Sequence, residues 1–518
     1  MLARLTTAAV IGVEAVPVIV EVDVGAGGLP GLTMVGLPDP TVRESRDRVR
    51  TAIRNAGFPF PPTRVTVSLA PSDMRKVGAT FDLPIAMGIL AASGALPYHP
   101  DRPLVIVGGL SLDGAVPRMR GVLPMAAAAR RAGVGLVFPQ ENLAEAGIVG
   151  GLPLFPVRSI LDAARVLVNP DRQPVEPPVV PEDPTPDGED LADVRGQFLG
   201  RRALEIAATG AHHLLLHGPP GAGKTMLASR LPGLLPPLDF DEALAVTTIH
   251  SIAGVLPPRA GLLTRRPFRA PHHTCSEMAL VGGGSIPRPG ELSLAHHGVL
   301  FLDELPEFSR RALETLRQPL EQGVINIARA ARSVVFPARV MLVAAMNPCP
   351  CGFHGSPARR CHCPPGVVEQ YRRRPSGPLL DRFDLLIDLP AVPWSDIVAT
   401  DTPPESSAVV RERVLEARAR QKHRQGVLNG ELNGPRLREN CQPATATGSA
   451  LLERAVKRFG LSVRGVTRVL RVARTIADLA GETSVRDAHV AEALQFRTSG
   501  PFTGEAHGYE NGDFGRAM

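Results

Sequence analysis

A glycine-rich loop that ends in lysine and threonine has the clearest chemistry in the sequence. Residues 218–225 follow the short apolar run Leu214–His217 and precede a stretch to Leu235 that is typical of a helix. Glycines let backbone N–H groups converge on phosphate oxygens, and a helix N-terminus adds partial positive charge. In such a loop Lys224 would contact the β- and γ-phosphates of a nucleotide, and the Thr225 hydroxyl would bind Mg²⁺. The predicted phosphate-binding residues are Gly218, Pro219, Pro220, Gly221, Ala222, Gly223, Lys224 and Thr225.

Lysine is rare in this chain, and its rarity makes the position of Lys224 informative. Of 57 basic residues only four are lysines, at positions 76, 224, 422 and 457, and all the others are arginines. GC-rich codon usage is the simpler explanation for the arginine excess, and selection for arginine chemistry is the alternative. Under either explanation, a lysine at the end of a phosphate-binding loop is hard to attribute to chance.

Two later apolar runs end in polar residues that would complete a nucleotide site. Residues 298–304 end in Asp303, which would hold Mg²⁺, and Glu304, which would polarise the attacking water. Residues 339–347 end in Asn347, which would orient the same water. A buried strand that ends in Asp-Glu by accident and a turn role for Asn347 are the alternatives. The sequence therefore predicts ATP and Mg²⁺ as cofactors and hydrolysis of the γ-phosphate as the reaction.

The cysteines are concentrated in one short segment. Four of the six cysteines lie close together as two C-x-C pairs, Cys349 with Cys351 and Cys361 with Cys363. Four thiolates suit tetrahedral Zn²⁺, although C-x₂-C is the commoner spacing, and nearby histidines are substitute ligands. A loop rich in Gly, Pro and Arg has little core of its own, so a bound metal would fix it. We predict a structural zinc at the rim of the active site, with reduced free thiols or a redox-active disulfide as alternatives.

The composition narrows the class of protein. The 518 residues are 44% hydrophobic and 21% charged, with a formal net charge of +6, which excludes disorder throughout. The sequence has no run of about 18 uncharged apolar residues, so no membrane span is predicted. Acidic residues interrupt the apolar N-terminus, which is therefore typical of a strand rather than a signal peptide. We expect a cytoplasmic protein with no membrane association.

The elements that must position these residues indicate a multidomain α/β fold. Residues 1–170 mix alternating strands such as Val16–Val24, and another predicted at Leu104–Leu110, with helices, which indicates an α+β domain. Residues 171–192 are rich in proline, and residues 171–194 hold eight acidic residues against one basic residue. Such a stretch cannot bury a core, so we predict a linker.

Three further segments follow the linker. Residues 193–395 carry the nucleotide motifs and predict a P-loop α/β core. Residues 396–498 predict a helical lid, in which Glu405–Gln425 is expected to be a solvated helix of mixed charge. Residues 499–518 are rich in glycine and weakly apolar, which predicts a disordered tail.

Part of the first domain resembles the proteolytic domain of the Lon family. The similar stretch begins at Gly109-Leu-Ser-Leu-Asp-Gly114 and ends in the Arg-Ala-Gly of Arg120–Gly133. In this comparison Leu123 stands where that family has its catalytic lysine, and the segment near the expected serine offers only Thr80. A serine–lysine dyad needs the lysine as its base. The resemblance therefore implies a Lon-protease-like fold without protease chemistry.

Five motifs resemble those of the magnesium-chelatase-like AAA+ ATPases known as the YifB/ComM family. They read Asn-Pro-Cys-Pro-Cys-Gly at 347–352, Pro-His-His-Thr at 271–274, Gly-Gly-Gly at 282–284, Pro-Arg-Pro-Gly-Glu at 287–291 and Gly-Pro-Leu-Leu-Asp-Arg-Phe-Asp at 377–384. The resemblance covers nearly the whole chain. It implies a Lon-like N-terminal α+β domain, a P-loop AAA+ α/β core and a C-terminal helical lid of the magnesium-chelatase type.

The resemblance also implies roles for two arginines. Arg382 corresponds to the arginine finger, which reaches the γ-phosphate bound by a neighbouring subunit, and Arg464 corresponds to sensor 2. Cationic stabilisation of this kind accelerates phosphoryl transfer by about 10³–10⁵-fold. A finger supplied in trans makes activity depend on a ring, which the family implies is a homohexamer. The alternative for Arg382 is an ion pair with Asp381 or Asp384.

Basic residues in an insertion and a hairpin are candidates for DNA contact. The insertion covers residues 265–284, and the hairpin joins Val324–Ile327 to Ser333–Phe336. A solvated surface role is the alternative for each arginine, and one Trp with three Tyr disfavours base stacking. His272 and His273 are expected to be buried structural histidines rather than metal ligands. The candidate phosphate contacts are Arg269, Arg288, Arg329 and Arg332.

The expected function is that of an ATP-hydrolysing hexameric ring motor acting on DNA. By resemblance, its activity would be branch migration, or helicase activity, on recombination intermediates, including those of natural transformation. Residues 195–518 hold 40 basic and 30 acidic residues, which suits a polyanionic partner. One alternative is the motor subunit of a metal chelatase that inserts Mg²⁺ into a tetrapyrrole. The other is a protein-remodelling machine, against which Leu123 argues.

Overall fold

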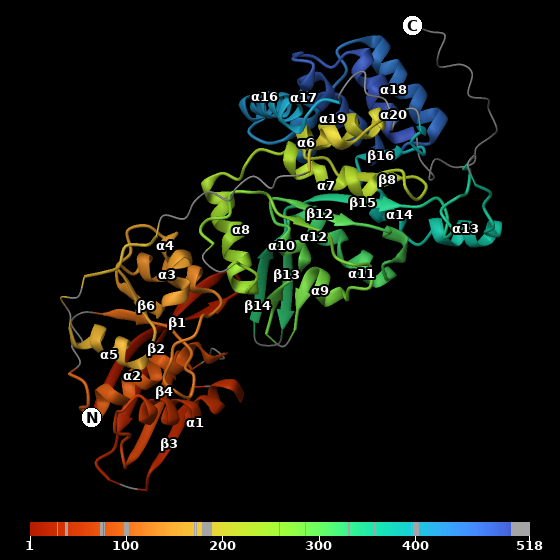
Figure 1. Ribbon diagram of the computed structural model, residues 1–518. Helices are drawn as coiled ribbons and strands as arrows, with labels where there is room; N and C mark the ends of the chain where they lie inside the picture. The colour runs from red at the N-terminus through yellow and green to blue at the C-terminus, as the bar shows by residue number, and fades with distance from the viewer. Residues whose placement is uncertain are drawn as a thin grey trace.

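The computed structural model describes most of the chain (Figure 1). The described residues are 1–27, 29–36, 40–72, 76, 78–97, 103–169, 171, 173–178, 189–257, 260–284, 286–329, 332–356, 359–394, 396 and 404–498. The predicted tail at 499–518 and much of the predicted linker at 171–192 lie outside these residues. The end of that linker is part of the second domain, because Leu191 is buried and its N–H donates to Ser407 Oγ at 2.8 Å.

The N-terminal part contains a seven-stranded mixed sheet in the order β3-β4-β2-β1-β5-β6-β7. Alternation along the strands fills two cores, so Val137 faces one side of the sheet while Leu136 and Phe138 face the other. The strands are β1 (Leu2–Ile11), β2 (Glu14–Val24), β3 (Gly31–Val35), β4 (Arg64–Ala70), β5 (Leu104–Ile106), β6 (Gly135–Pro139) and β7 (Leu154–Val157). Helices α1 (Pro40–Asn55), α2 (Asp82–Ala92) and α5 (Ile160–Val168) cover one face, and α3 (Val122–Arg131) and α4 (Leu143–Gly147) cover the other.

The strand predicted at Leu104–Leu110 is too long, because β5 ends at Ile106. Beyond it the chain turns toward the start of α2, where Gly108 N–H donates to the carbonyl of Thr80 at 3.1 Å. The carbonyl of Gly108 in turn accepts from Leu83 N–H at 3.0 Å. These bonds to a helix start replace the ladder that a longer strand would have made.

A second sheet, of five parallel strands, carries the residues predicted to bind a nucleotide. Its order is β16-β8-β15-β12-β9, and the strands are β8 (Leu214–His217), β9 (Phe268–Arg269), β12 (Val299–Leu302), β15 (Met341–Met346) and β16 (Leu385–Asp388). Leu215 packs into one core while Leu214 and Leu216 pack into the other, so both faces are covered, as is usual for a parallel sheet. The predicted α/β class is confirmed.

Helices α6 (Phe198–Gly210) and α7 (Lys224–Leu234) cover one face of this sheet, and shorter elements cover the other. The shorter helices are α9 (Glu277–Val281), α10 (Glu291–Leu294), α11 (Arg310–Thr315), α12 (Arg317–Gln322), α13 (Pro365–Arg372) and α14 (Gly377–Leu380). Two small hairpins pair β10 (Gly282–Gly283) with β11 (Arg288–Pro289) and β13 (Val324–Arg329) with β14 (Arg332–Pro337). The predicted hairpin is therefore present and two residues longer on its first strand.

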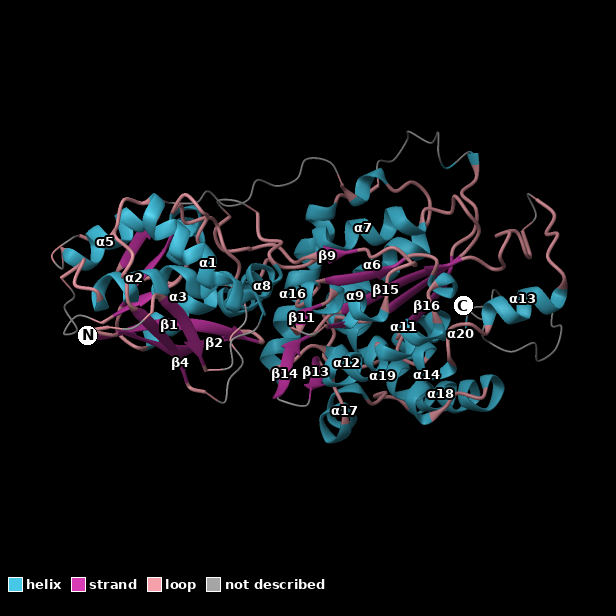
Figure 2. Cartoon of the chain, turned by 90° about the horizontal axis from the view of Figure 1, so that it is seen from below, coloured by secondary structure: helices cyan, strands magenta, loops and turns pink. Residues whose placement is uncertain are grey.

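Helix α8 (Phe240–Ala253) lies between the parts of the molecule that contain the two sheets, as Figure 2 shows. Its Ser251 Oγ donates to the buried Glu145 at 2.5 Å, and Arg118 Nη2 donates to the carbonyl of Leu256 at 2.8 Å. The N-terminal domain is thus held on the second domain by polar contacts, of which the one between Ser251 and Glu145 is buried. Glu145 also accepts from the backbone N–H of Leu123, whose side chain is buried and offers no base.

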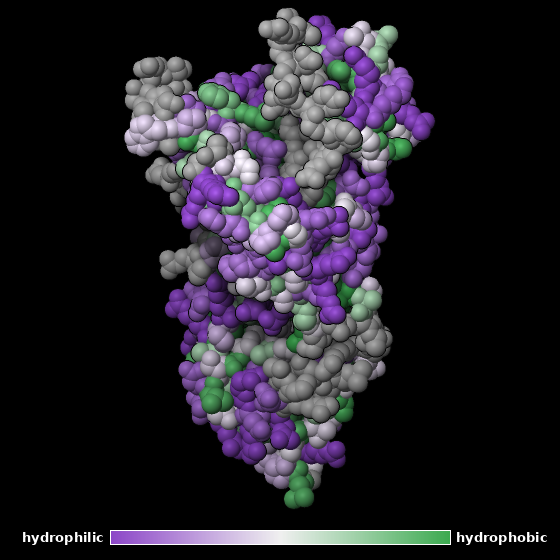
Figure 3. Space-filling model, turned by 90° about the vertical axis from the view of Figure 1, so that its right-hand side faces the viewer, coloured by the Kyte–Doolittle hydropathy of each residue, from purple (hydrophilic) through white to green (hydrophobic). Residues whose placement is uncertain are grey.

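The C-terminal part is helical, as expected. It comprises α16 (Ser407–Gln425), α17 (Gly434–Cys441), α18 (Ala446–Phe459), α19 (Val463–Leu479) and α20 (Asp487–Thr498). The prediction that the first of these is a solvated helix is wrong, because Val410, Val414 and Ala417 are buried against α6, α7 and α19. Spacings of four and three residues put these side chains on one face, and most of the charged residues occupy the other. Arg418 is an exception, since it is buried and donates to the carbonyl of Ala208. None of the described helices is long and apolar enough to span a membrane, and the face in Figure 3 is largely hydrophilic.

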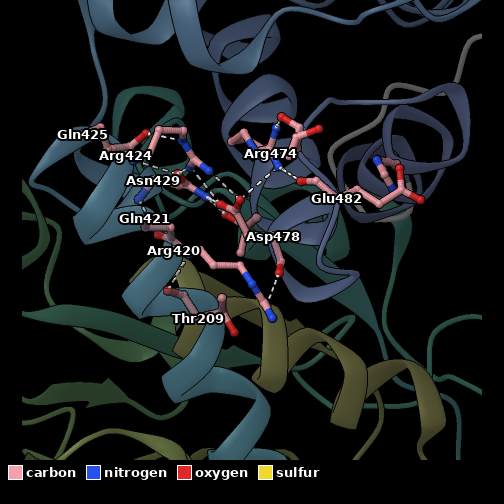
Figure 4. Close-up of polar contacts among 12 residues, drawn as sticks. Thr209, Arg420, Gln421, Arg424, Gln425, Asn429, Arg474, Asp478 and Glu482 are labelled. Carbon is pink, nitrogen blue, oxygen red and sulfur yellow. Dashed lines mark hydrogen bonds and ion pairs between the residues drawn. The ribbon is translucent and has the colours of Figure 1, made fainter.

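A buried carboxylate ties the helical region together (Figure 4). Asp478 on α19 accepts from both guanidinium nitrogens of Arg424 at 2.6 and 2.9 Å and from Arg474 at 2.9 Å. It also accepts from Asn429 Nδ2 at 2.8 Å. Asp478 and Arg474 are each only 1% exposed, so these charges depend on one another for solvation.

We expect the substitution Asp478→Ala to destabilise the helical region by about 3–5 kcal/mol, because it leaves two buried or half-buried guanidinium groups without their carboxylate partner. Faster hydrogen exchange in α16 and α19, and a lower first unfolding transition, would measure the effect. Glu416→Ala is the control, since it removes an exposed carboxylate that pairs with Arg420 on the same helix. Equal behaviour of the two variants would contradict the importance of the buried cluster.

Candidate nucleotide-binding site

The predicted phosphate-binding loop lies between β8 and the start of α7, at the carboxyl edge of the parallel sheet. Two of its glycines need their conformational freedom, because Gly221 and Gly223 have φ of 78° and 82°, which L side chains rarely adopt. A Cβ at Gly218 would lie 2.4 Å from the carbonyl oxygen of Leu389. The glycine pattern is therefore required by the backbone path of the loop.

Lys224 is held inside this loop. Its ammonium donates to the carbonyls of Gly218 and Pro219 at 2.7 and 2.8 Å and to Asn347 Oδ1 at 2.9 Å. Burial lowers the pKa of Lys224 to about 8, although the charges of Asp303 and Glu304 act in the opposite direction. The structure thus brings together the lysine of the loop and the asparagine predicted at the end of β15.

Asp303 and Thr225 lie side by side, as a Mg²⁺ site requires. Thr225 Oγ1 donates to Asp303 Oδ2 at 2.7 Å, and the other carboxylate oxygen accepts from the N–H of Glu304 at 2.9 Å. Mg²⁺ prefers oxygen ligands and usually takes only one or two carboxylates from the protein. The hydroxyl and carboxylate fit that ion, which would neutralise the phosphate charge when bound with a nucleotide.

Glu304 occupies an unusual backbone position next to this pair. Its φ of 52° is uncommon outside glycine, and its side chain is half exposed. His273 Nδ1 lies 3.2 Å from Glu304 Oε2. The prediction that His272 and His273 are buried is wrong, because His272 is exposed and His273 is 30% exposed. Both histidines follow β9, which pairs with β12, and the glutamate follows β12. This pairing places His273 next to Glu304.

Gln197 is a site residue that the sequence did not reveal. Its side-chain amide donates to the carbonyls of Ala222 and Pro390 at 2.9 and 2.7 Å, and so ties the phosphate-binding loop to the chain after β16. The residue itself has a positive φ of 48°. No local motif marks it, because its partners are 25 and 193 positions away.

Arg382 and Arg464 lie at the opposite edge of the sheet from the phosphate-binding loop. Both line a cleft of about 920 Å³, together with His213, Gly298, Val340 and Asp384, the residues that precede β8, β12, β15 and β16. Strands of at least four residues separate these two edges by roughly 13 Å. These two arginines therefore face away from the nucleotide site of their own chain.

The ion pair that Arg382 forms is not the one considered as the alternative to its finger role. Its guanidinium pairs with Glu321 on α12 rather than with Asp381 or Asp384, and its side chain is 12% exposed. Asp384 instead contacts His212 at 3.3 Å and Arg468 at 3.4 Å. Burial opposes ionisation of Asp384, yet the hydrogen bond and charge of His212 and the charge of Arg468 hold its pKa at about 2.

The four clustered cysteines converge in space. Their Sγ atoms all lie within 4.8 Å of one another, and Cys349 is buried while the others are partly exposed. Hydrogen bonds from the backbone at Phe353 and His362 lower the pKa of Cys351 to about 6. The side chains of His354 and His362 are not part of the cluster. All six cysteines are free thiols, so the disulfide alternative is not formed here.

The candidate DNA contacts fall into two groups. Arg269 forms a two-pronged ion pair with Glu291 at 2.7 and 2.8 Å, so its guanidinium is engaged by a carboxylate at the start of α10. Arg288 is exposed on β11. Arg329 and Arg332 are paired opposite each other at the end of the β13–β14 hairpin, and their side chains lie outside the described part of the structure.

Comparisons with known proteins agree with this architecture. Three family models match the chain: "Subunit ChlI of Mg-chelatase" over residues 20–142, "Magnesium chelatase, subunit ChlI" over 190–397, and "Magnesium chelatase, subunit ChlI C-terminal" over 404–497. A magnesium-chelatase 67 kDa subunit of Chlorobaculum parvum is 28% identical over 30% of this chain and 23% of its own.

Several relatives match over nearly their full length. Competence protein ComM of Haemophilus influenzae is 45% identical over 96% of this chain and 97% of its own. The uncharacterized protein YifB of Escherichia coli is 44% identical over 95% of this chain and 96% of its own. Full-length similarity at this level, together with a phosphate-binding loop on a parallel sheet, shows that the chain belongs to the YifB/ComM family of magnesium-chelatase-like AAA+ ATPases.

Proposed function

We propose that this protein is an ATP-driven ring motor that acts on DNA, and that it moves branch points of recombination intermediates. The observation that carries the ring is the placement of Arg382 and Arg464 at the edge of the sheet opposite the phosphate-binding loop. A complete hydrolytic site then needs two chains, one that binds ATP and one that supplies arginines. Head-to-tail contacts of this kind close into rings, and we propose a hexamer.

Within one chain, the residues at the carboxyl edge divide the work of hydrolysis. In the free protein, hydrogen bonds from the Lys224 ammonium to the carbonyls of Gly218 and Pro219 hold the loop around this lysine. When ATP binds, the ammonium exchanges these bonds for bonds to phosphate oxygens. Thr225 and Asp303 hold Mg²⁺, and Glu304 accepts a proton from the attacking water. The arginines of the neighbouring chain stabilise the charge that develops on the transferred phosphoryl group.

The DNA part of the proposal rests on the competence protein among the relatives and on charge. Residues 195–518 hold ten more basic than acidic residues, counted from 40 and 30. Arg288 is exposed on one hairpin, and Arg329 and Arg332 end another. Arginines at hairpin ends suit contact with phosphates, which gives affinity without sequence preference.

We place the protein in the cytoplasm, where free thiols such as those of its six cysteines stay reduced.

A chelatase motor is the second candidate, since all three matching family models are named for a magnesium-chelatase subunit. The chelatase relative covers only 30% of this chain, however, whereas the ComM and YifB relatives cover 95% or more. Stimulation of ATP hydrolysis by a four-way DNA junction would separate the two candidates. A wild-type protein that neither binds the junction nor responds to it would refute the DNA proposal.

The lowered pKa of Lys224 predicts that ATP binding weakens at alkaline pH. In the free protein this lysine loses its proton as the pH rises through about 8, whereas bound phosphates would retain that proton. Affinity is therefore expected to fall by up to about tenfold per pH unit above pH 8, with uptake of a proton on binding. Calorimetry in buffers of different ionisation heat measures both quantities. The exposed Lys457→Met variant should keep this profile, and a flat affinity up to about pH 10 would contradict the prediction.

The trans role of Arg382 predicts that two inactive variants rescue each other. Lys224→Ala removes ATP binding and Arg382→Ala removes the finger, so each alone should lose hydrolysis by about 10³-fold or more. In an equimolar mixture, about a quarter of the interfaces in a closed ring would join an intact loop to an intact arginine. Steady-state hydrolysis should recover on mixing. If Arg382 acted in cis, the mixture would stay as inactive as its components.

The hairpin assignment predicts a change in salt dependence. Arg329→Ala with Arg332→Ala should weaken junction binding and lower the slope of log K against log[salt] by about 2, one unit for each lost phosphate contact. Fluorescence anisotropy over a salt series measures this slope. Arg454→Ala, an exposed arginine on α18, is the matched control and should leave the slope unchanged. A double variant with wild-type affinity and slope would exclude the hairpin from the DNA path.

A further inference from the structure

We propose that Cys349, Cys351, Cys361 and Cys363 bind one structural Zn²⁺, and that this metal holds the phosphate-binding loop and Asn347 in place. The proposal concerns nucleotide binding only and is independent of the DNA assignment. It makes the metal a condition for ATP affinity rather than a participant in hydrolysis.

The spacing of the sulfur atoms fits a single tetrahedral ion. Cys349 Sγ lies 3.4 Å from Cys351 Sγ and 3.7 Å from Cys361 Sγ, and the latter two are 3.6 Å apart. Zn–S bonds of about 2.3 Å place the corners of a tetrahedron about 3.8 Å apart. The distances are far longer than the bond of about 2.05 Å in a disulfide, so every thiol is available as a ligand.

Backbone N–H groups support the sulfurs as they do around bound metals. His354 N–H donates to Cys349 Sγ at 3.3 Å, and Cys363 N–H donates to Cys361 Sγ at 3.4 Å. Such bonds offset the negative charge that four thiolates carry, and they fix the orientation of each ligand. The sequence forms this arrangement with tight turns, including a positive φ of 83° at Gly352.

The loop has few other means of holding its shape. From Cys351 to Pro364, half of the described residues are exposed and all the others except Gly352 are partly exposed. The aromatic Phe353 is only partly buried, with the guanidinium of Arg359 4.6 Å from the centre of its ring. A segment with so little apolar contact loses more conformational entropy on ordering than its packing returns. Metal binding supplies the missing free energy in small loops of this kind.

The same loop rests directly on the nucleotide site. A Cβ added at Gly352 would come within 2.5 Å of both Cγ and Cδ of Pro220, so the cysteine loop touches the phosphate-binding loop at a point where only glycine fits. Asn347, which accepts from Lys224, precedes the first cysteine by two residues. From the other side, Arg372 Nε donates to the carbonyl of Pro348 at 3.1 Å. A metal that fixes the cysteines therefore also fixes the phosphate-binding loop and Asn347, which lie on two sides of the nucleotide site.

Metal content and ATP affinity of the full-length chain test the proposal. Mass spectrometry of the purified protein should find about one zinc per chain in wild type and in Cys275→Ser, a control thiol outside the cluster, and background zinc in Cys361→Ser/Cys363→Ser. Binding of a fluorescent ATP analogue should weaken by at least about tenfold in the double variant, because small displacements of positioning groups are costly. A mercurial reagent that releases zinc from wild type should have the same effect.

Several outcomes would overturn the proposal. Wild type purified without metal, or with iron in place of zinc, would reject the assigned ion. A zinc-free double variant with wild-type ATP affinity would reject the link to the nucleotide site. Gly352→Ala keeps all four thiols and tests the contact with Pro220 separately: retained zinc with weakened ATP binding supports the brace, and retained zinc with unchanged binding refutes it.

Discussion

The parallel orientation of the five-stranded sheet is the constraint on which the rest of the structure depends. All five strands run the same way, so their carboxyl ends gather the phosphate-binding loop, Asp303 and Asn347 at one edge. The same geometry sends whatever precedes the strands, including Arg382, to the other edge. In the proposed ring, one chain would bind ATP and the next would supply the arginines, because a single chain holds these two groups at opposite edges of its sheet.

The carboxyl edge is braced by segments that are distant in the sequence. Gln197 ties the phosphate-binding loop to the chain after β16, the cysteine loop presses on Pro220, and His273 contacts Glu304 from the insertion. A half-exposed glutamate at positive φ would otherwise sample several positions. The insertion and the residue that would activate water are thus in physical contact through one histidine.

Local sequence was sufficient for some parts of this site and insufficient for others. The phosphate-binding loop could be predicted because its glycines are required by backbone angles within eight residues. Gln197 and Glu321 could not, because their roles arise from partners more than 20 positions away. Partners that are distant in the sequence also explain two incorrect predictions. The strand predicted at Leu104–Leu110 ends early because the residues after it bond to the start of α2, and the orientation of His273 is set by its neighbour on the next strand.

A buried ion pair links the segments that carry Arg382 and Arg464, the two arginines assigned to the neighbouring site in the proposed ring. Asp384 lies two residues after Arg382, and Arg468 lies one helical turn after Arg464 on α19, so the contact at 3.4 Å between Asp384 and Arg468 fixes the arginines relative to each other. His212 extends the contact to Thr475 at 2.8 Å, one turn before Asp478.

Buried polar chains of this kind are costly to disrupt when one member is lost. In the proposed ring, the helical region would therefore contribute to the neighbouring site, because its packing sets the position of Arg464 on α19. Because Arg468 pairs with Asp384 directly before β16, a lid that moved independently of this strand would have to break the buried ion pair before it could separate Arg382 from Arg464.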